Sequence, residues 1–174
     1  MRVPARVRIG AALVVALGAL AGVFLLVARI RSNESDVGRL GFASTSAAPA
    51  PFAAFGQARV AVGSRCLRVL VASTETQRVQ GLRGVRSLAP FEGMVFVFPR
   101  DTNARFTMAD TPTPLDITFF SAGGAPVDGA RMKPCPAGTD ASCPAYASRE
   151  RYRYALERPA GSASASGAIG ACAA

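Results

Sequence analysis

Gly93-Met94-Val95-Phe96-Val97-Phe98 is a continuous apolar run that stops at Pro99. A run of this length, with valine and phenylalanine alternating and no charged residue, is typical of a strand buried on both of its faces. Proline ends it because proline cannot donate a ladder hydrogen bond. The stretch therefore predicts a central buried β-strand around which the rest of a domain is organised.

Strand patterns recur on both sides of this run. Alternation and β-branched residues predict five further strands, at residues 66–71, 105–109, 115–120, 126–132 and 151–157. Ser73-Thr74-Glu75-Thr76 offers an N-cap, followed by helix formers to about Leu82, and Gly81 or Gly84 can end that helix. The expected fold class is mainly β: a compact barrel- or sandwich-like domain with one short helix, preceded by a transmembrane helix.

The N-terminal segment has the length of a membrane span. Residues 10–28 carry no charge, and as a helix they would extend about 28 Å, close to the roughly 30 Å of a hydrocarbon core. Arg29-Ile30-Arg31 follows, as at a membrane interface. Residues 1–31 are predicted to be a transmembrane signal-anchor that leaves the rest outside the cytoplasm. A cleaved signal, with the cut near residues 43–45 or 47–49, is the alternative.

Residues 32–57 are rich in Ser, Ala, Pro and Gly and show neither helical nor strand periodicity. They predict a flexible linker between the anchor and a β-rich domain at residues 58–174. The alternative is that Phe42, Phe52 and Phe55 pack on that domain.

Composition excludes several classes of function. The 20 Lys and Arg residues exceed the 11 Asp and Glu residues, but no long basic stripe with interleaved aromatics is present, so we expect no nucleic-acid partner. Histidine is absent, which removes the commonest general base, the Ser-His and Cys-His nucleophile pairs and the commonest metal ligand. We expect no cofactor and no metal.

Four cysteines are present, and an even number in an exported domain favours disulfides. They allow three pairings, of which we choose Cys135–Cys143 with Cys66–Cys172. A four-cysteine zinc site lacks the close C-x-x-C spacing, and a catalytic thiol would have no histidine to activate it.

A series of short motifs carries a family resemblance between about Leu67 and Ala160. The motifs are Gly81-Leu82, Arg86-Ser87-Leu88, residues 93–98, Phe106, Met108, Thr111, Pro114-Leu115-Asp116-Ile117, Pro134-Cys135, Cys143-Pro144, Tyr146, Ser148, Tyr154-Ala155-Leu156-Glu157 and Pro159-Ala160-Gly161. In this order they resemble the domain-of-unknown-function family 192. The resemblance implies a small β-rich domain, often exported, with no established catalytic role. Thr107 stands where the family often has tryptophan, and Ala109-Asp110 where it often has Lys-Asn, so a site built on those residues is not carried over.

Four polar residues form a candidate pocket. Asp110 and Asp116 flank a segment stiffened by two prolines, which would hold both carboxylates in place, and Thr111 and Glu92 complete the set. These residues suit a polar ligand or a cation. The structural alternative, which we favour, is that Asp116 accepts hydrogen bonds from turn amides.

Arg149, Arg151 and Arg153 recur at every second position, so on a strand they would share one face, with Tyr152 and Tyr154 on the other. Guanidinium groups in a row suit anionic lipid headgroups or glycans. A solvated strand face is the alternative, and we favour it.

These patterns together predict a membrane-anchored, envelope-side accessory or binding domain with an unknown ligand. Because no catalytic constellation is recognisable, we expect the domain to be non-enzymatic. Its expected partners are the membrane, through the N-terminal helix, and an unknown envelope ligand or protein. The expected location is periplasmic or extracellular, or secreted if the signal is cleaved. The alternative function is a carboxylate-dependent hydrolase using Asp110, Asp116 or Glu92 as acid and base.

Overall fold

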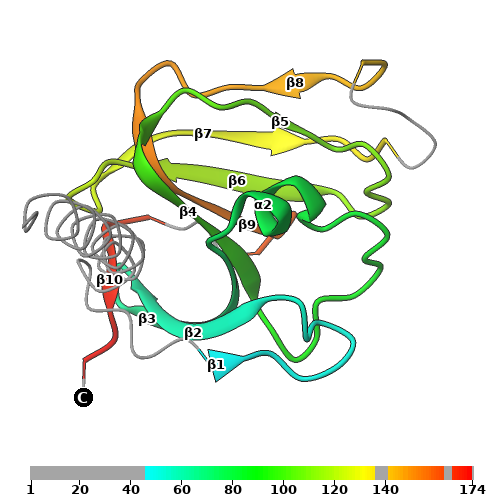
Figure 1. Cartoon of the computed structure of the whole chain (residues 1–174). Helices are drawn as coiled ribbons and strands as arrows, with labels where there is room; N and C mark the ends of the chain where they lie inside the picture. Colours follow the sequence, from blue (N-terminus) through cyan, green and yellow to red (C-terminus); the bar gives the residue numbers. More distant parts are fainter. Residues whose placement is uncertain (1–45, 136–140, 163–165, 174) are drawn as a thin grey trace, which may run out of the picture. The chain divides into compact units, whose positions relative to one another are not determined.

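The computed structural model describes residues 46–135, 141–162 and 166–173 (Figure 1). The predicted membrane segment at residues 10–28 and Phe42 lie outside these ranges. Within them, no helix is both long enough and apolar enough to cross a membrane.

One sheet dominates the described residues. Its strand order is β1-β2-β3-β4-β9-β6-β7, with β10 also paired to β2, and a separate two-stranded sheet joins β5 to β8. The strands are β1 (Ser46–Ala47), β2 (Gly56–Val62), β3 (Arg65–Ala72), β4 (Gly93–Thr102), β5 (Phe106–Thr107), β6 (Leu115–Phe120), β7 (Pro126–Met132), β8 (Ala145–Tyr146), β9 (Tyr152–Pro159) and β10 (Ile169–Ala171). Neighbouring strands are antiparallel except β3 and β4, which are parallel. The connection between those two contains the helix α2 (Glu75–Gln80).

The predicted central strand is confirmed, but it continues through Pro99 to Thr102 and does not end at the proline. β4 lies between β3 and β9, and its residues from Gly93 to Val97 are all buried. The mainly β class with one short helix is likewise confirmed. The barrel form of the prediction is wrong, because the sheet is not closed: β7, at one edge, does not pair with β1, β2 or β10 at the other. β10 has only three residues, and it reaches the β6–β7 turn through a hydrogen bond from the Ile169 amide to the Gly124 carbonyl (2.8 Å) instead of a ladder.

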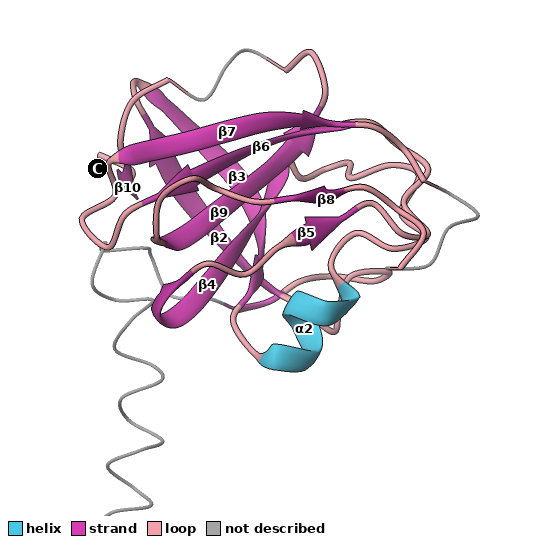
Figure 2. Cartoon of the chain, turned by 90° about the horizontal axis from the view of Figure 1, so that it is seen from above, coloured by secondary structure: helices cyan, strands magenta, loops and turns pink. Residues whose placement is uncertain are grey.

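The sheet bends strongly between β2–β3 and β6–β7, as Figure 1 shows, and a separate core forms on each of its faces. Along β4 the side chains alternate between the two: Met94 and Phe96 enter one core, and Val95 and Val97 enter the other. We call the first the α2-side core, because α2 lies over that face beside β4 and β5 (Figure 2). The second, which contains Ile169, we call the β10-side core. The domain therefore has two hydrophobic layers that share one sheet.

The domain begins earlier than predicted. β1 and the start of β2 fall inside the predicted linker, and Phe52 and Phe55 are buried in the α2-side core. The ring of Phe52 meets that of Phe91 edge-on, with centroids 5.8 Å apart. The alternative, in which these phenylalanines pack on the domain, thus holds for both, because burial of two large rings outweighs the flexible composition around them.

α2 starts as its sequence predicts. The hydroxyl of Thr74 accepts a hydrogen bond from the Gln77 amide (3.2 Å), and the Gln77 side chain accepts one from the Thr74 amide (3.1 Å), which completes a capping box. The helix ends at Gln80, two residues before the predicted end, because Gly81 turns the chain with a φ of 46°.

Both predicted disulfides are present. Cys66–Cys172 joins the start of β3 to the residue after β10, across a sequence separation of 106. Cys135–Cys143 closes a short loop between β7 and β8. Cys66 is exposed and belongs to neither core, whereas Cys135 packs against the α2-side core.

β9 departs from strict alternation. Its pairing with β4 shifts register between Val97 and Thr102, so Tyr152 enters the α2-side core and Tyr154 the β10-side core. The prediction that both tyrosines share one face is therefore wrong. The register shift lies between the two tyrosines, so Tyr152 faces the opposite side of the sheet from Tyr154.

Candidate functional site

A pocket of about 420 Å³ opens between α2, β4 and the segment that follows β4. Its walls are mainly apolar and come from the α2-side core: Leu82, Phe96, Phe98, Phe106, Met108 and Leu115. Charged groups are few, namely Glu75, Arg78, Arg83, Arg105 and Glu157. An apolar cavity with a small number of placed polar groups is the usual form of a small-molecule site.

Glu157 is the buried charged residue of this pocket. It lies on β9 between β4 and β6, opposite Met94 and Ile117, so its side chain points from the middle of the sheet toward α2. Only 4% of it is exposed. Burial raises the pKa of its carboxyl to about 8. The carboxyl therefore stays protonated near neutral pH, because a charge in this apolar setting would lose its hydration.

Among the described residues, none donates a hydrogen bond to the Glu157 carboxyl, and none forms an ion pair with it. A buried polar group normally has a protein or water partner, and a group that lacks one in a native structure points to a ligand, a water or a functional role. The inner end of the pocket thus presents a hydroxyl-bearing acid that can both donate and accept a hydrogen bond.

The outer part of the pocket carries arginines. Arg78 donates from Nη1 to the carbonyls of Ser73 (2.6 Å) and Val97 (2.9 Å), and its guanidinium lies 5.1 Å from the centroid of the Phe98 ring. Burial lowers the pKa of Arg78. Arg105 is exposed, and within the part of the chain that the structure describes it forms no hydrogen bond or ion pair.

An exposed apolar side chain stands beside these arginines. Val79 lines the pocket from α2 and is 66% exposed, and it is the large hydrophobic residue that stands out from an otherwise covered surface in the described ranges. A single exposed valine is ordinary on its own. Here it extends the apolar wall to the opening, so an apolar molecule would meet continuous apolar surface from outside to inside.

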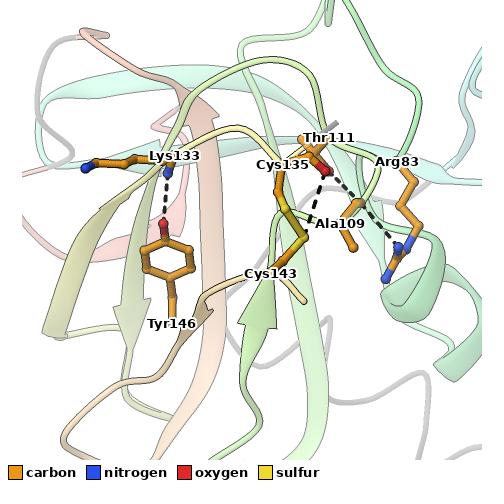
Figure 3. Close-up of a disulfide and its surroundings, with 7 residues drawn as sticks. All are labelled: Arg83, Ala109, Thr111, Lys133, Cys135, Cys143 and Tyr146. Carbon is orange, nitrogen blue, oxygen red and sulfur yellow. Dashed lines mark hydrogen bonds between the residues drawn. A yellow bond between two sulfur atoms is a disulfide. The ribbon is translucent and has the colours of Figure 1, made fainter. Parts of the chain in front are cut away.

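The wall opposite α2 is held by the short disulfide. The Cys135 amide donates to the Thr111 carbonyl (3.2 Å), and Arg83 donates from Nη1 to the Ala109 carbonyl (3.2 Å). Figure 3 shows both contacts on the same segment, with the Cys135–Cys143 bond on one side and Arg83 on the other. Residues 109–111 are thus fixed between the disulfide loop and α2, which keeps the pocket wall in place.

The structure brings one of the four predicted pocket residues to this site. Thr111 is buried and lines the pocket, although its hydroxyl donates to the Ala109 carbonyl (3.2 Å). Asp110 is exposed, with a left-handed φ of 53°, and it does not line the pocket.

The other two predicted residues hold the framework. Glu92 accepts from the Arg68 amide (3.1 Å) and from Arg65 (3.3 Å). Asp116 accepts from Arg131 (2.9 Å) and from the Gly161 amide (3.1 Å), and the bond from Arg131 lowers the pKa of its carboxyl. The structural reading of Asp116 as an acceptor for turn amides therefore agrees with its contacts.

The three predicted face arginines are engaged with aspartates. Arg149 pairs with Asp128 (3.1 Å), Arg153 pairs with Asp101 (3.0 Å), and Arg151 donates to the Asp101 carbonyl. These contacts hold residues 149–153 against β4 and β7. Arg149 and Arg151 precede β9, and the side chain of Arg153 is only 11% exposed, so the three arginines do not form one solvated strand face.

Comparisons with known proteins give a family and a fold. The sequence model of the family DUF192, described as "Uncharacterized ACR", matches residues 58–170. A crystal structure of a proposed transcription regulator from Sinorhizobium meliloti 1021 is 31% identical, covering 59% of this chain and 78% of that one, with a TM-score of 0.51. A protein of unknown function from Novosphingobium aromaticivorans DSM 12444 is 22% identical, covering 71% and 85%, with a TM-score of 0.56. No curated protein matches.

Proposed function

The chain belongs to the DUF192 family, and we propose that its domain is a non-enzymatic binding module that takes a small amphipathic molecule into the pocket beneath α2. The volume of about 420 Å³ falls in the range of ligand pockets, roughly 300–1,000 Å³. The apolar walls suit the body of such a molecule. Its polar group would meet Glu157.

The observation that carries this proposal is the Glu157 carboxyl, which lines the pocket without a partner among the described residues. No fully buried side-chain oxygen in the described ranges lacks a hydrogen-bond partner, so this carboxyl is open to the pocket. A ligand hydroxyl, carbonyl or amide can therefore reach it and form a hydrogen bond. Apolar residues such as Met94 and Ile117 occupy the opposite positions on the neighbouring strands, so a structural need for an acid here is not evident from the packing.

We also propose that the module works on the outer side of a membrane. Disulfides persist in oxidising compartments, and both cysteine pairs are joined. The apolar run at residues 10–28 would supply the anchor. The test is the intact mass of the full chain purified from membranes without reductant. A retained N-terminus with four hydrogens missing supports the proposal, whereas four free thiols would contradict it.

Binding can be tested with the full chain in lipid nanodiscs, using phenylpropanol as a water-soluble amphipathic probe and empty nanodiscs as the blank. The methyl carbon of Met108, which lines the pocket, should shift on titration. That of Met132, which is buried in the same core but does not line the pocket, should shift less. Ala104→Trp should abolish the shift by filling the pocket. Glu157→Leu should weaken binding about tenfold through loss of one buried hydrogen bond.

The exposed Glu150→Leu is the matched control and should bind as the unmodified chain does. If the Met108 signal did not shift at any probe concentration, the result would contradict the proposal. So would equal shifts at Met108 and Met132, since they would indicate general partition of the probe into the core.

A carboxylate-dependent hydrolase is the second candidate, and one observation favours it. Glu157 has a raised pKa, and Glu75 is another carboxylate that lines the same pocket. A pair of carboxyls with different environments is the arrangement used for acid and base catalysis. Glu75 lies on α2 within the field of Arg78, outside the buried end of the pocket. Hydrolysis of an amphipathic ester that Glu157→Gln and Glu75→Gln both abolish would favour this candidate over the binding module.

A further inference from the structure

We infer that the molecule held in this pocket is an amphipathic anion, whose acidic group lies at the opening beside Arg105 and whose apolar body extends inward between the phenylalanines. This inference rests on the proposed function, because it specifies the ligand class of the same pocket. It follows from how charge is distributed between the inner and outer ends.

The outer end is cationic. Three guanidinium groups line the pocket, from Arg78, Arg83 and Arg105, against one exposed carboxylate from Glu75. The inner end carries no charge near neutral pH, because the buried Glu157 carboxyl keeps its proton. An anion that enters therefore meets attraction at the opening and no negative charge at the inner end.

Arg105 is the group best placed to hold the acid. Arg78 is already committed to the carbonyls of Ser73 and Val97 and to the Phe98 ring. Arg105 is exposed and has no hydrogen bond or ion pair to any residue in the described ranges. It precedes Phe106, a pocket wall whose ring meets Phe96 edge-on with centroids 5.0 Å apart. A guanidinium fork next to an aromatic wall suits a carboxylate or phosphate joined to an apolar body.

A cationic ligand fits less well. An amine would have to pass three guanidinium groups, and at the inner end it would gain an ion pair only after Glu157 released its proton. A neutral ligand would gain the apolar contacts but nothing from the opening. The arrangement therefore ranks anion above neutral molecule above cation.

The test compares three probes that share one aromatic body. Hydrocinnamate is anionic, phenylpropanol is neutral and phenylpropylamine is cationic at neutral pH. Each is titrated into the full chain in neutral-lipid nanodiscs, with the Met108 methyl signal as the readout. Hydrocinnamate should bind about fivefold tighter than phenylpropanol, as one charged contact at an exposed site allows, and phenylpropylamine should bind the weakest.

Arg105→Gln should reduce the preference for hydrocinnamate over phenylpropanol to less than about twofold. Arg100→Gln is the matched control: Arg100 is an exposed arginine on β4 outside the pocket lining, and its loss should leave the ranking intact. Raised salt should weaken hydrocinnamate more than phenylpropanol.

The outcomes separate the two proposals. If phenylpropanol binds as well as hydrocinnamate, or if phenylpropylamine binds tightest, the anion inference is overturned while the binding module stands. An unchanged ranking in Arg105→Gln likewise overturns the role of Arg105. If no probe moves the Met108 signal, both the binding module and its ligand class fail.

Discussion

The two faces of one sheet differ in how completely they are packed. The β10-side core contains aliphatic residues with Phe120 and Tyr154, and within the described residues no partly buried hydrophobic side chain packs against it. Ile169 of strand β10 packs in this core, and the Cys66–Cys172 bond joins the residue after β10 to β3. The α2-side core is larger and holds most of the aromatic rings, yet it leaves a pocket of about 420 Å³ and buries Glu157 within it.

This difference indicates that the β10 side of the sheet mainly stabilises the domain and that the α2 side mainly binds the ligand. Cavities and buried acids both reduce stability, so a face that contains both is difficult to explain by stability alone. The sealed face and the long disulfide can supply the stability that the pocket face lacks. Changes on the β10 side should therefore act mainly on unfolding, and changes on the α2 side mainly on binding.

The largest effect should come from the long disulfide. Cys66→Ala with Cys172→Ala should lower the free energy of unfolding by about 4.7 kcal/mol in the chain-entropy model, since the bond closes a loop of about a hundred residues. Cys135→Ala with Cys143→Ala should cost about 2.6 kcal/mol and should also loosen the pocket wall. Urea unfolding of both double variants measures this, and a larger loss from the short loop would contradict the proposed division.

A matched pair of phenylalanines tests the two cores directly. Phe120→Ala in the β10-side core should cost about 4 kcal/mol, because the fully buried ring is lost and a cavity remains in its place. Phe106→Ala, on the pocket wall, should cost about half as much, because that ring is partly exposed already. Chemical unfolding gives both values. Equal losses would show that the pocket wall is as tightly packed as the sealed face.

Glu157 should make stability depend on pH. The folded carboxyl keeps its proton up to about pH 8, whereas in the unfolded chain it ionises near its ordinary pKa of 4.5. The folded state binds more protons in this window, so stability falls as pH rises, by at most about 1.4 kcal/mol per pH unit. Glu157→Gln should flatten this slope, with a gain on the order of 3 kcal/mol at the alkaline end.

Urea unfolding between pH 5 and pH 9, at about unit steps, measures the slope. The exposed Glu150→Gln serves as the control and should keep the pH dependence of the unmodified chain. If the free energy of unfolding of Glu157→Gln still fell with rising pH, a group other than Glu157 would be responsible for the pH dependence.

The smallest effect should come from the cap of α2. Thr74→Ala removes the hydroxyl of the capping box and should cost about 1 kcal/mol. Amide hydrogen exchange should quicken in α2 while β2 and β3 remain protected. Thr76→Ala, an exposed position within the helix, should leave exchange unchanged. Faster exchange in β2 as well would mean that the two faces do not open separately.

Much of the sheet can be predicted from local sequence pattern. β3, β4, β6, β7 and β9 each carry a run of apolar or β-branched residues long enough to identify. Of the short strands, β5 falls within the predicted strand at residues 105–109, but β1, β8 and β10 were not predicted. Two or three residues contain no periodicity, and their pairing depends on the folded partner. β2 is missed for a related reason, since its first residues continue an Ala- and Pro-rich stretch that has the composition of a linker.

The site was less predictable than the fold. Strict alternation along β9 would place Glu157 on the same face as Arg153, where an acid is unremarkable. Residues 154–157 pair with β4 in unbroken register, so Glu157 shares the face of Ala155 in the α2-side core. The register shift beyond Val97 changes the face of Tyr152 instead. The signal that could have found Glu157 is a lone acid in an otherwise apolar stretch after Tyr154. By contrast, Asp110 and Asp116 were predicted as pocket residues because they flank a segment with two prolines. In the structure, the Asp116 carboxylate accepts hydrogen bonds from Arg131 and from the Gly161 amide.

The Cys66–Cys172 bond has a consequence for how the domain withstands proteases. It encloses β3 to β10 in one covalent ring, so a single cut anywhere between the two cysteines opens the ring without releasing a fragment. A clipped molecule would keep both pieces, and its strands could remain paired. A domain cut once would therefore lose its fold only if the paired strands also came apart.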